Sequence, residues 1–386
     1  MSEMNTSSKK NPVFFGLFLA AVLAVLLTVT GKEFLKQHEK EPIVPGPGVT
    51  EIKMLSDYFP KLKGTGGDSE VYILDSKKPG GTFVVMGGTH PTEPAGVLSA
   101  VLFVENAVMQ EGKLIVVPHS CESGFTWVEP GQGHSPYFHI KTDWGQRTFR
   151  YGGRGSNPIH QFPDPDMYLH YPSGQILAAD EIRNLNRAHP GNPDGLLTQQ
   201  IAYAFRKIVE TENADLIIDQ HEAPPEKPLV NAICVHQRAL DLAAMVALDL
   251  ETQDIEMRVE ASPVGLHGFS HRELGDHTKV LAILSETPNP SQGSARGRTD
   301  ETMAVTGYDP VYEEILAKKM LKLCYTKGGV PIEVRTGRDV ATICQIATTY
   351  TEMTPDRPIV IGNMPSYEEI TKNGLGKYLL PVPEKK

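Results

Sequence analysis

Short apolar runs alternate with helical stretches over most of the chain, and this alternation constrains the fold more than any other feature. Residues 71–74, 82–86, 113–118, 214–219 and 280–285 have the length and apolar character of buried strands. Strands that are apolar along their whole length are typical of a sheet covered on both faces. The stretches expected to be helical are 96–109, 196–212, 239–250 and 311–325. We therefore predict an α/β fold with a mixed, largely parallel sheet flanked by helices.

Two regions depart from this rhythm. Residues from about 120 to 180 are dense in Gly, Pro, His and aromatic residues and show no sustained period. A long irregular segment inside a compact domain is usually functional, so we expect an insertion that shapes a binding site. Residues 331–386 carry strand-like runs (PIEV, TICQIATTY and RPIVIG) and are expected to form a C-terminal extension, either an appendage or an extra sheet edge.

The N-terminal region contains an uncharged apolar run at residues 13–30, preceded by Lys9 and Lys10. This length is about the minimum for a helix that crosses a bilayer. No A-x-A cleavage site follows, which favours a transmembrane anchor over a cleaved signal peptide; a buried helix is the remaining alternative. We predict a cytoplasmic leader (1–12), an anchor or signal (13–30), a Pro- and Gly-rich linker (31–51) and a domain (52–330) outside the cytoplasmic membrane. The alternative is a secreted or periplasmic protein after signal cleavage.

Charge and cysteine content exclude some classes of protein. The formal net charge is −10 and the pI about 5.7, which argues against a nucleic-acid partner because such proteins present a basic surface. The four cysteines stand far apart without a CxxC spacing, so a thiolate zinc site is not expected. Disulfide pairing in an oxidising compartment remains open.

The first candidate metal ligands follow an apolar strand. In FVVMGGTHPTEPAG, a strand runs into Gly87 and Gly88, and His90 and Glu93 then open a helix. Ligands gather at the carboxyl ends of strands in open α/β sheets. A His and a Glu three residues apart can aim an imidazole nitrogen and a carboxylate at one zinc ion. The motif is weak by itself in a chain with 13 histidines.

Two further strand ends carry polar side chains. His221 follows the strand of DLIIDQHE, and Asp219 could orient it from behind. Two His and one Glu leave the fourth zinc position open, as in a catalytic site. Glu286 ends the strand of VLAILSETPNP, where it could act as general base toward water at the zinc. Each has an ordinary alternative, a solvated residue at the end of a strand.

A basic segment, residues 183–191 (RNLNRAHPG), supplies candidates for substrate recognition. A guanidinium group binds a carboxylate with two parallel hydrogen bonds, and it can also stabilise an oxyanion. The alternative is a solvated basic turn.

In this order the four segments resemble the succinylglutamate desuccinylase/aspartoacylase family of the zinc carboxypeptidase clan. Residues 87–93 match its GGxHxxE motif, 183–191 its RDLNRxFPG segment, 219–221 its D-x-H strand end, and Glu286 its late glutamate. The resemblance spans residues 71 to 317, and the combination is specific where each motif is not. It implies a zinc carboxypeptidase-like fold.

The resemblance also implies roles for individual residues. His90, Glu93 and His221 would bind one Zn²⁺ per chain, and Glu286 would activate water and pass its proton to the leaving amine. Asn186 and Arg187 would bind a substrate carboxylate, with Arg183 near the scissile carbonyl. No tyrosine lies between residues 230 and 286, so His267, His271 or Arg272 could take the place of the substrate-binding tyrosine of digestive carboxypeptidases.

Three positions depart from the family pattern: Pro91 replaces a frequent Gly, Asn184 the Asp of RDLNR, and His189 an aromatic residue. The last two are expected to alter the substrate side. We therefore predict a zinc hydrolase that cleaves an amide bond next to a carboxylate, in an N-acyl amino acid or a peptide, with a cell-wall peptide suiting the compartment. The alternative is a non-catalytic metal- or ligand-binding surface protein on the same fold. The oligomeric state stays open.

Overall fold

The computed structural model describes residues 12–129, 134–320 and 322–383. The chain divides after Lys40 into two compact units. The first contains helix α1 (Pro12–Lys36), which alone among the described helices is long and apolar enough to cross a membrane. Its length and composition fit an anchor and a signal sequence equally.

The second unit is built on a mixed sheet that has eight strands within the described residues. Four of the seven strand pairs are parallel, including the central pairs β5–β3, β3–β10 and β10–β13. This confirms the predicted fold class. In spatial order the strands are β1 (Glu51–Met54), β2 (Glu70–Asp75), β5 (Lys113–Val117), β3 (Thr82–Met86), β10 (Leu216–Ala223), β13 (Leu281–Pro288), β11 (Ala232–Val235) and β12 (Arg258–Ala261).

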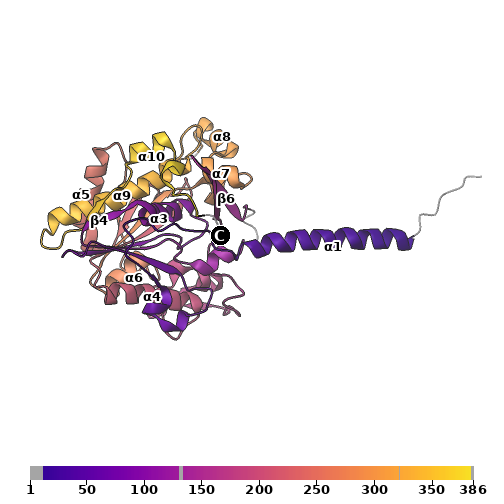
Figure 1. Cartoon of the computed structure of the whole chain (residues 1–386), viewed down its shortest axis with the longest axis horizontal. Helices are drawn as coiled ribbons and strands as arrows, with labels where there is room; N and C mark the ends of the chain where they lie inside the picture. The colour runs from indigo at the N-terminus through magenta and orange to yellow at the C-terminus, as the bar shows by residue number, and fades with distance from the viewer. Residues whose placement is uncertain (1–11, 130–133, 321, 384–386) are drawn as a thin grey trace, which may run out of the picture. The chain divides into compact units, whose positions relative to one another are not determined.

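Helices cover both faces of this sheet (Figure 1). Helices α3, α5, α9 and α10 lie on one side, where their apolar residues share one core with alternate strand residues such as Phe83 and Ile218. Helices α4 and α6 lie on the other side, over a second core that includes Val84 and Ile217. The helices of this unit are α2 (Leu55–Tyr58), α3 (Pro94–Asn106), α4 (Leu197–Thr211), α5 (Leu240–Glu251), α6 (Ser270–His277), α7 (Glu301–Thr306), α8 (Pro310–Lys318), α9 (Ile332–Met353) and α10 (Tyr367–Asn373).

The C-terminal region differs from the sequence prediction. PIEV and TICQIATTY were predicted to be strand-like, but both fall within the 22-residue helix α9. That prediction was wrong because it relied on the many β-branched residues of the segment. The buried positions of α9 follow helical spacing instead (Ile332, Val340, Ile343, Ala347 and Tyr350). In RPIVIG, β14 (Val360–Gly362) does form and pairs with β4 (Val108–Glu111), outside the main sheet.

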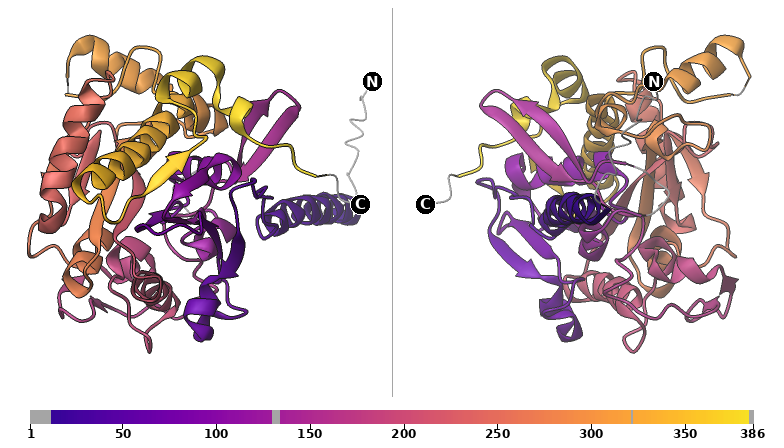
Figure 2. Two further views of the ribbon diagram at one scale, coloured as in Figure 1. Left: turned by 60° about the vertical axis from the view of Figure 1, so that its left-hand side comes forward. Right: turned by 90° about the vertical axis from the view of Figure 1, so that its right-hand side faces the viewer.

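The insertion at 120–180 contains more regular structure than its composition suggests. Strands β6 (Tyr137–Thr142) and β7 (Gly145–Arg150) form an antiparallel hairpin, and β8 (Tyr168–Leu169) pairs with β9 (Ile176–Leu177). The hairpin lies beside the C-terminal segment, where Trp144 donates its indole N–H to the carbonyl of Leu379 at 3.2 Å (Figure 2). The alternation of Phe138 and Ile140 with polar residues is the signal that sequence reading missed.

The segment predicted to be a linker is held by the second unit from Glu41 onward. Glu41 pairs with the buried Arg150 and lies 3.0 Å from Nε2 of His119, and the carbonyl of Pro42 accepts a hydrogen bond from Arg147 at 2.6 Å. The proposed domain limits themselves stay predictions. All four cysteines are free thiols.

Candidate metal centre and hydrolytic site

The β3–α3 connection places His90 and Glu93 at the end of a central strand. Gly88 turns the chain with φ +63°, and a Cβ there would lie 2.8 Å from the Phe125 ring and from the carbonyl of Pro118. This position therefore requires glycine. His90 follows in the turn, and Glu93 is the residue before the first turn of α3. Both side chains are almost completely buried.

Strands β10 and β13 bring His221 and Glu286 side by side. They are parallel neighbours, and His221 is the register partner of Glu286. The sequence suggested that His221 follows the strand. Strand β10 instead continues to Ala223, so His221 lies inside it. Since register partners point to the same face of a sheet, Glu286 faces the same region as His221.

The three predicted metal ligands converge. Their donor atoms lie within 4.8 Å of one another. Nδ1 of His90 is 2.8 Å from Oε1 of Glu93, Nδ1 of His221 is 2.8 Å from Oε2 of Glu93, and the two Nδ1 atoms are 3.1 Å apart. We name this group the His90 cluster.

The opposite nitrogen of each imidazole is held by an oxygen acceptor. Nε2 of His90 lies 2.8 Å from Oδ1 of Asn184, and Nε2 of His221 lies 3.0 Å from Oδ2 of Asp219. Asp219 is itself fixed by hydroxyl donors, Thr89 at 2.7 Å and Ser270 at 2.6 Å. These contacts place the Nε2 protons outward and leave the Nδ1 lone pairs facing each other. Asn184 was expected to alter the substrate side; the structure places it behind His90 instead.

The protonation of the cluster follows from its burial and its charges. Burial lowers the pKa of His90 to about 4. Burial acts in the same direction on His221, but Asp219 and Glu93 outweigh it and hold the pKa of His221 well above its usual range. Burial would raise the pKa of Glu93, yet the two imidazoles keep it well below its ordinary value. The raised pKa of His221 favours its protonated form when no metal is bound, and the Nδ1–H of that form can donate to Oε2 of Glu93 at 2.8 Å.

Glu286 stands beside this cluster as a carboxyl group without a fixed partner. Its Oε2 atom is buried and accepts no hydrogen bond from the described residues. Burial raises the pKa of Glu286 to about 8, with Glu93 and Asp219 adding to the rise and His221 and Arg154 opposing it. A raised pKa suits a group that takes up and releases a proton near neutral pH.

A cavity of about 290 Å³ opens next to Glu286. Its walls are largely apolar, with Leu229, Leu266, Phe269 and Leu284 among them. His271 also lines it, and burial lowers the pKa of that imidazole to about 3, so it is neutral. The cavity therefore offers a largely apolar binding surface directly beside the candidate base, with the carboxylate of Glu260 also in its wall.

Arg154 reaches the cluster, although sequence reasoning did not select it. Its Nη1 atom lies 3.2 Å from Oε1 of Glu93, and the side chain is partly exposed. It stands in the glycine-rich run YGGRGSN of the insertion, where a Cβ on Gly155 would lie 2.7 Å from the carbonyl of Arg183. A single arginine among glycines in an irregular segment was the available signal.

Arg183, the residue predicted to lie near the scissile carbonyl, has other partners. Its Nε atom pairs with Asp164 at 2.9 Å, and its guanidinium group lies 5.4 Å from the centre of the Trp127 ring. Both partners belong to the insertion. Of these two arginines, Arg154 contacts Glu93, whereas Arg183 pairs within the insertion.

Asn186 and Arg187 lie close to the cluster in different ways. Nδ2 of Asn186 is 3.3 Å from Nε2 of His221, and its Oδ1 accepts the backbone N–H of Ser270 at 2.9 Å. Arg187 stacks on Phe269, with 4.0 Å between the guanidinium carbon and the ring centre. Burial lowers the pKa of Arg187. The charge of Glu181 is the strongest influence opposing this shift. Arg187 thus remains the better placed of the two for a substrate carboxylate.

The other two predicted substrate residues face partners of their own. Arg272 is buried and hydrogen-bonds with Asp276 and with Oε1 of Gln237 at 2.6 Å. Nδ1 of His267 lies 2.9 Å from Oε1 of Glu273. In the same segment His271, not His267 or Arg272, lines the cavity beside Glu286.

Helix α9 supports the site through a buried ion pair. Nη1 of Arg335 donates to Oε1 of Glu222 at 2.6 Å, and both side chains are inaccessible to solvent. Oε2 of Glu222 accepts the backbone N–H of Ala95 in the first turn of α3 at 3.0 Å. Helix α9, part of which was predicted to be strand-like, therefore connects β10 to α3 next to two of the candidate metal ligands.

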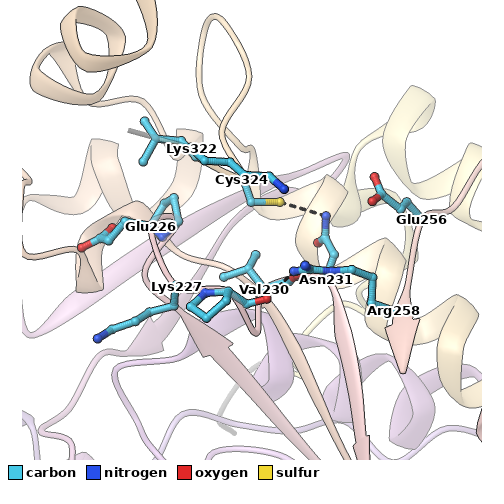
Figure 3. A pocket seen from close by; sticks show the side chains of 11 residues that line it. Glu226, Lys227, Val230, Asn231, Glu256, Arg258, Lys322 and Cys324 are labelled. Carbon is cyan, nitrogen blue, oxygen red and sulfur yellow. Dashed lines mark hydrogen bonds between the residues drawn. The ribbon is translucent and has the colours of Figure 1, made fainter. Parts of the chain in front are cut away.

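A further hollow of about 430 Å³ lies elsewhere in the second unit (Figure 3). Its labelled walls carry both charges (Glu226, Lys227, Glu256 and Arg258), and Asn231 donates to the sulfur of Cys324 at 3.0 Å. Two backbone carbonyls, those of Pro228 and Val230, accept from Arg258. None of the predicted site residues lines this hollow.

Comparison with solved structures gives fold-level similarity. A succinylglutamate desuccinylase from Silicibacter sp. TM1040 is 18% identical, with 59% of this chain and 55% of that chain covered and a TM-score of 0.37. A metallo-carboxypeptidase from Burkholderia cenocepacia is 11% identical (83% and 68% covered, TM-score 0.44). The cell shape determinant protein Csd4 from Helicobacter pylori is 10% identical (80% and 59% covered, TM-score 0.42).

The resemblance predicted from the motifs is confirmed to this extent, that solved structures of these families are among those similar to the chain. The chain spans slightly more than half the length of the desuccinylase-type structures that it matches. No family model matches the sequence, and no curated protein does. We rest no functional argument on similarity at these TM-scores.

Proposed function

We propose that this chain is a zinc-dependent hydrolase that cleaves an amide bond next to a carboxylate. The observation that carries the proposal is the convergence of the His90 cluster with Glu286 on the adjacent strand, a half-buried residue whose buried Oε2 atom has no hydrogen-bond partner among the described residues. Two Nδ1 lone pairs at 3.1 Å repel each other unless a cation or a proton lies between them. Two imidazoles and a carboxylate are the donor set of catalytic zinc sites.

The three side chains His90, Glu93 and His221 would hold the ion. Zinc in such a site would supply a Lewis acid for a carbonyl oxygen and for water. Asp219 and Asn184 would keep both imidazoles in the tautomer that presents Nδ1. The contacts of Asp219 and Asn184 with the Nε2 atoms suit this role.

Glu286 would carry the proton. It accepts a proton from water as the water oxygen bonds to the carbonyl carbon, and it returns that proton to the leaving nitrogen when the C–N bond breaks. Its raised pKa favours the return step. Arg154, whose guanidinium group lies beside Glu93, would donate N–H groups to the oxygen on which negative charge develops.

Arg187 would bind the substrate carboxylate. Its guanidinium plane is fixed against Phe269, so little side-chain entropy is lost when a carboxylate pairs with it. Phe269 also lines the cavity next to Glu286, which would receive an uncharged, largely apolar group of the substrate. An N-acyl amino acid or a short peptide has both features. A cell-wall peptide is the form that fits a domain outside the cytoplasmic membrane.

We also propose that α1 is an uncleaved membrane anchor and that the second unit lies on the extracytoplasmic side. The helix has 25 residues and a single basic residue in its last turn. Alkaline extraction of membranes tests this directly. The full-length chain should stay in the membrane fraction, whereas a cleaved signal would give a shorter soluble chain.

Glu286→Gln tests the hydrolase. The amide keeps the size of the side chain but cannot take up the proton, so turnover should fall by about 10²–10⁴-fold while zinc stays bound. The full chain would be assayed in detergent against N-acyl amino acids and peptides with a free C-terminal carboxylate, with bound zinc measured on the same samples. Zinc-loaded wild-type protein that released no product from any of them would instead support a metal-binding surface protein.

A further inference from the structure

A second group of imidazole and carboxylate side chains lies outside the site described above. His170, His267 and Glu273 have donor atoms within 4.8 Å of one another. Nε2 of His277 lies 3.2 Å from Oε2 of Glu273, the other oxygen of the same carboxylate. We name these four residues the His170 cluster. They come from three segments: the turn after β8, the loop before α6, and α6 itself.

Glu273 is the centre of this group. Its side chain is 2% exposed, and Nδ1 of His267 and Nε2 of His170 lie 2.9 Å and 3.8 Å from its Oε1 atom. The backbone N–H of Gly268 also donates to Oε1 at 3.0 Å. Among the described residues, the ion pairs of Glu273 are all with histidines.

This arrangement leaves the charge of Glu273 poorly balanced. A buried carboxylate is unfavourable unless a cation compensates it, and a neutral imidazole carries no charge. A protonated imidazole would supply one positive charge. A divalent cation would balance the carboxylate and be coordinated by three further nitrogen donors at the same time.

We propose that the His170 cluster binds a second divalent cation of the zinc class. Two imidazoles and one carboxylate converge as zinc ligands do, and His277, at the other oxygen of the carboxylate, would complete a closed, four-ligand structural site. Glu273 and His277 are four residues apart on α6, so both point to the same side of the helix. Nε2 of His170 lies 2.6 Å from the carbonyl of His189; to bind the metal through Nε2, the neutral ring would carry its proton on Nδ1 instead, where Oγ of Ser173 lies 2.7 Å away.

The cation would brace one wall of the hydrolytic site. His170 is in contact with the carbonyl of His189, two residues beyond Arg187. Ser270, at the start of α6, hydrogen-bonds with Asp219 and Asn186. A metal on the His170 cluster would thus join the insertion to α6 while staying outside the reaction itself.

Metal stoichiometry tests this proposal without reference to turnover. The full chain in detergent would be stripped with a chelator and titrated with Zn²⁺, with bound metal and the thermal midpoint measured together. Wild-type protein should bind two equivalents per chain. His267→Ala/His277→Ala should lose one equivalent and the rise in thermal midpoint that accompanies it, and His90→Ala should keep that equivalent.

His139→Ala is the matched control, because His139 pairs with a glutamate, Glu301, at 2.7 Å but lies in neither cluster. It should bind two equivalents. His277→Gln, at a side chain that is 32% exposed, is a milder variant and should weaken the second equivalent at least tenfold without unfolding the chain. A single equivalent in the wild type that the double variant retains, or two undiminished equivalents in the double variant, would overturn the proposal.

Discussion

The His90 cluster and the His170 cluster have nearly the same donors but different surroundings. Each has a buried glutamate between imidazoles. In the first, Asn184 and Asp219 hold the imidazoles from behind, Arg154 contacts Glu93, and Glu286 on the adjacent strand lines a cavity. In the second, His267 and His277 are both about one-third exposed and contact Glu273 from a loop and a short helix. We infer from this difference a catalytic role for the first cluster and a structural role for the second.

Of the substitutions that distinguish the His90 cluster from the His170 cluster, Arg154→Ala should have the largest effect on turnover. Removing a donor to a developing oxyanion typically costs about 10²–10³-fold in turnover. Arg183→Ala is the matched control, since its guanidinium group is engaged by Asp164 and Trp127. It should change turnover less than tenfold. Steady-state kinetics on both variants give the answer, and a larger loss in Arg183→Ala would restore the role predicted from the sequence.

Asp219→Asn should weaken metal binding at the His90 cluster alone. The amide removes the charge that holds Nε2–H of His221, and changes behind a ligand typically cost about 10–100-fold in affinity. Competition with a chromogenic chelator measures this affinity. The His170 cluster should be unaffected, and equal weakening of both equivalents would show general loosening of the fold.

Metal binding at the His90 cluster should strengthen with pH. The pKa of His221 is raised, so below that pKa the ion must displace one proton, whereas His90 is already neutral and Glu93 already ionised. Affinity should rise about tenfold per pH unit from about pH 6 until His221 titrates. The same proton stabilises the metal-free fold below the unfolded-state pKa of His221, and that contribution is lost as pH rises through the raised pKa. Zinc titrations at several pH values measure the slope; a flat profile would mean that His221 binds no proton there.

The convergence of His90, Glu93 and His221 could be predicted from the sequence because they stand at or near the ends of strands. His90 follows a strand that ends at Gly87 and Gly88, and the structure places buried β10 and β13 next to each other in the sheet. Glu286 and His221 were therefore brought together by the alternation of strands and helices. The same logic failed for α9, where β-branched residues concealed a helical spacing.

The substrate side could not be predicted in the same way. Arg154, Trp127 and Asp164 lie in the insertion, where close packing between distant segments decides the direction of each side chain. Arg183 and Arg154 are the same residue type, and only their contacts in the folded chain distinguish them: Asp164 and Trp127 for Arg183, Glu93 for Arg154. Asn184 shows the same limit, because its place behind His90 depends on a contact across 94 residues of sequence.

Zinc content and hydrolysis measured together on His90→Ala test the central claim most directly. The substitution removes one donor of the His90 cluster and leaves Glu286, Arg154 and the His170 cluster intact. We predict that the purified chain loses the equivalent bound at this cluster and that turnover falls to background. Hydrolysis at the wild-type rate, or full zinc content at wild-type affinity, would show that the reaction does not depend on His90, Glu93 and His221.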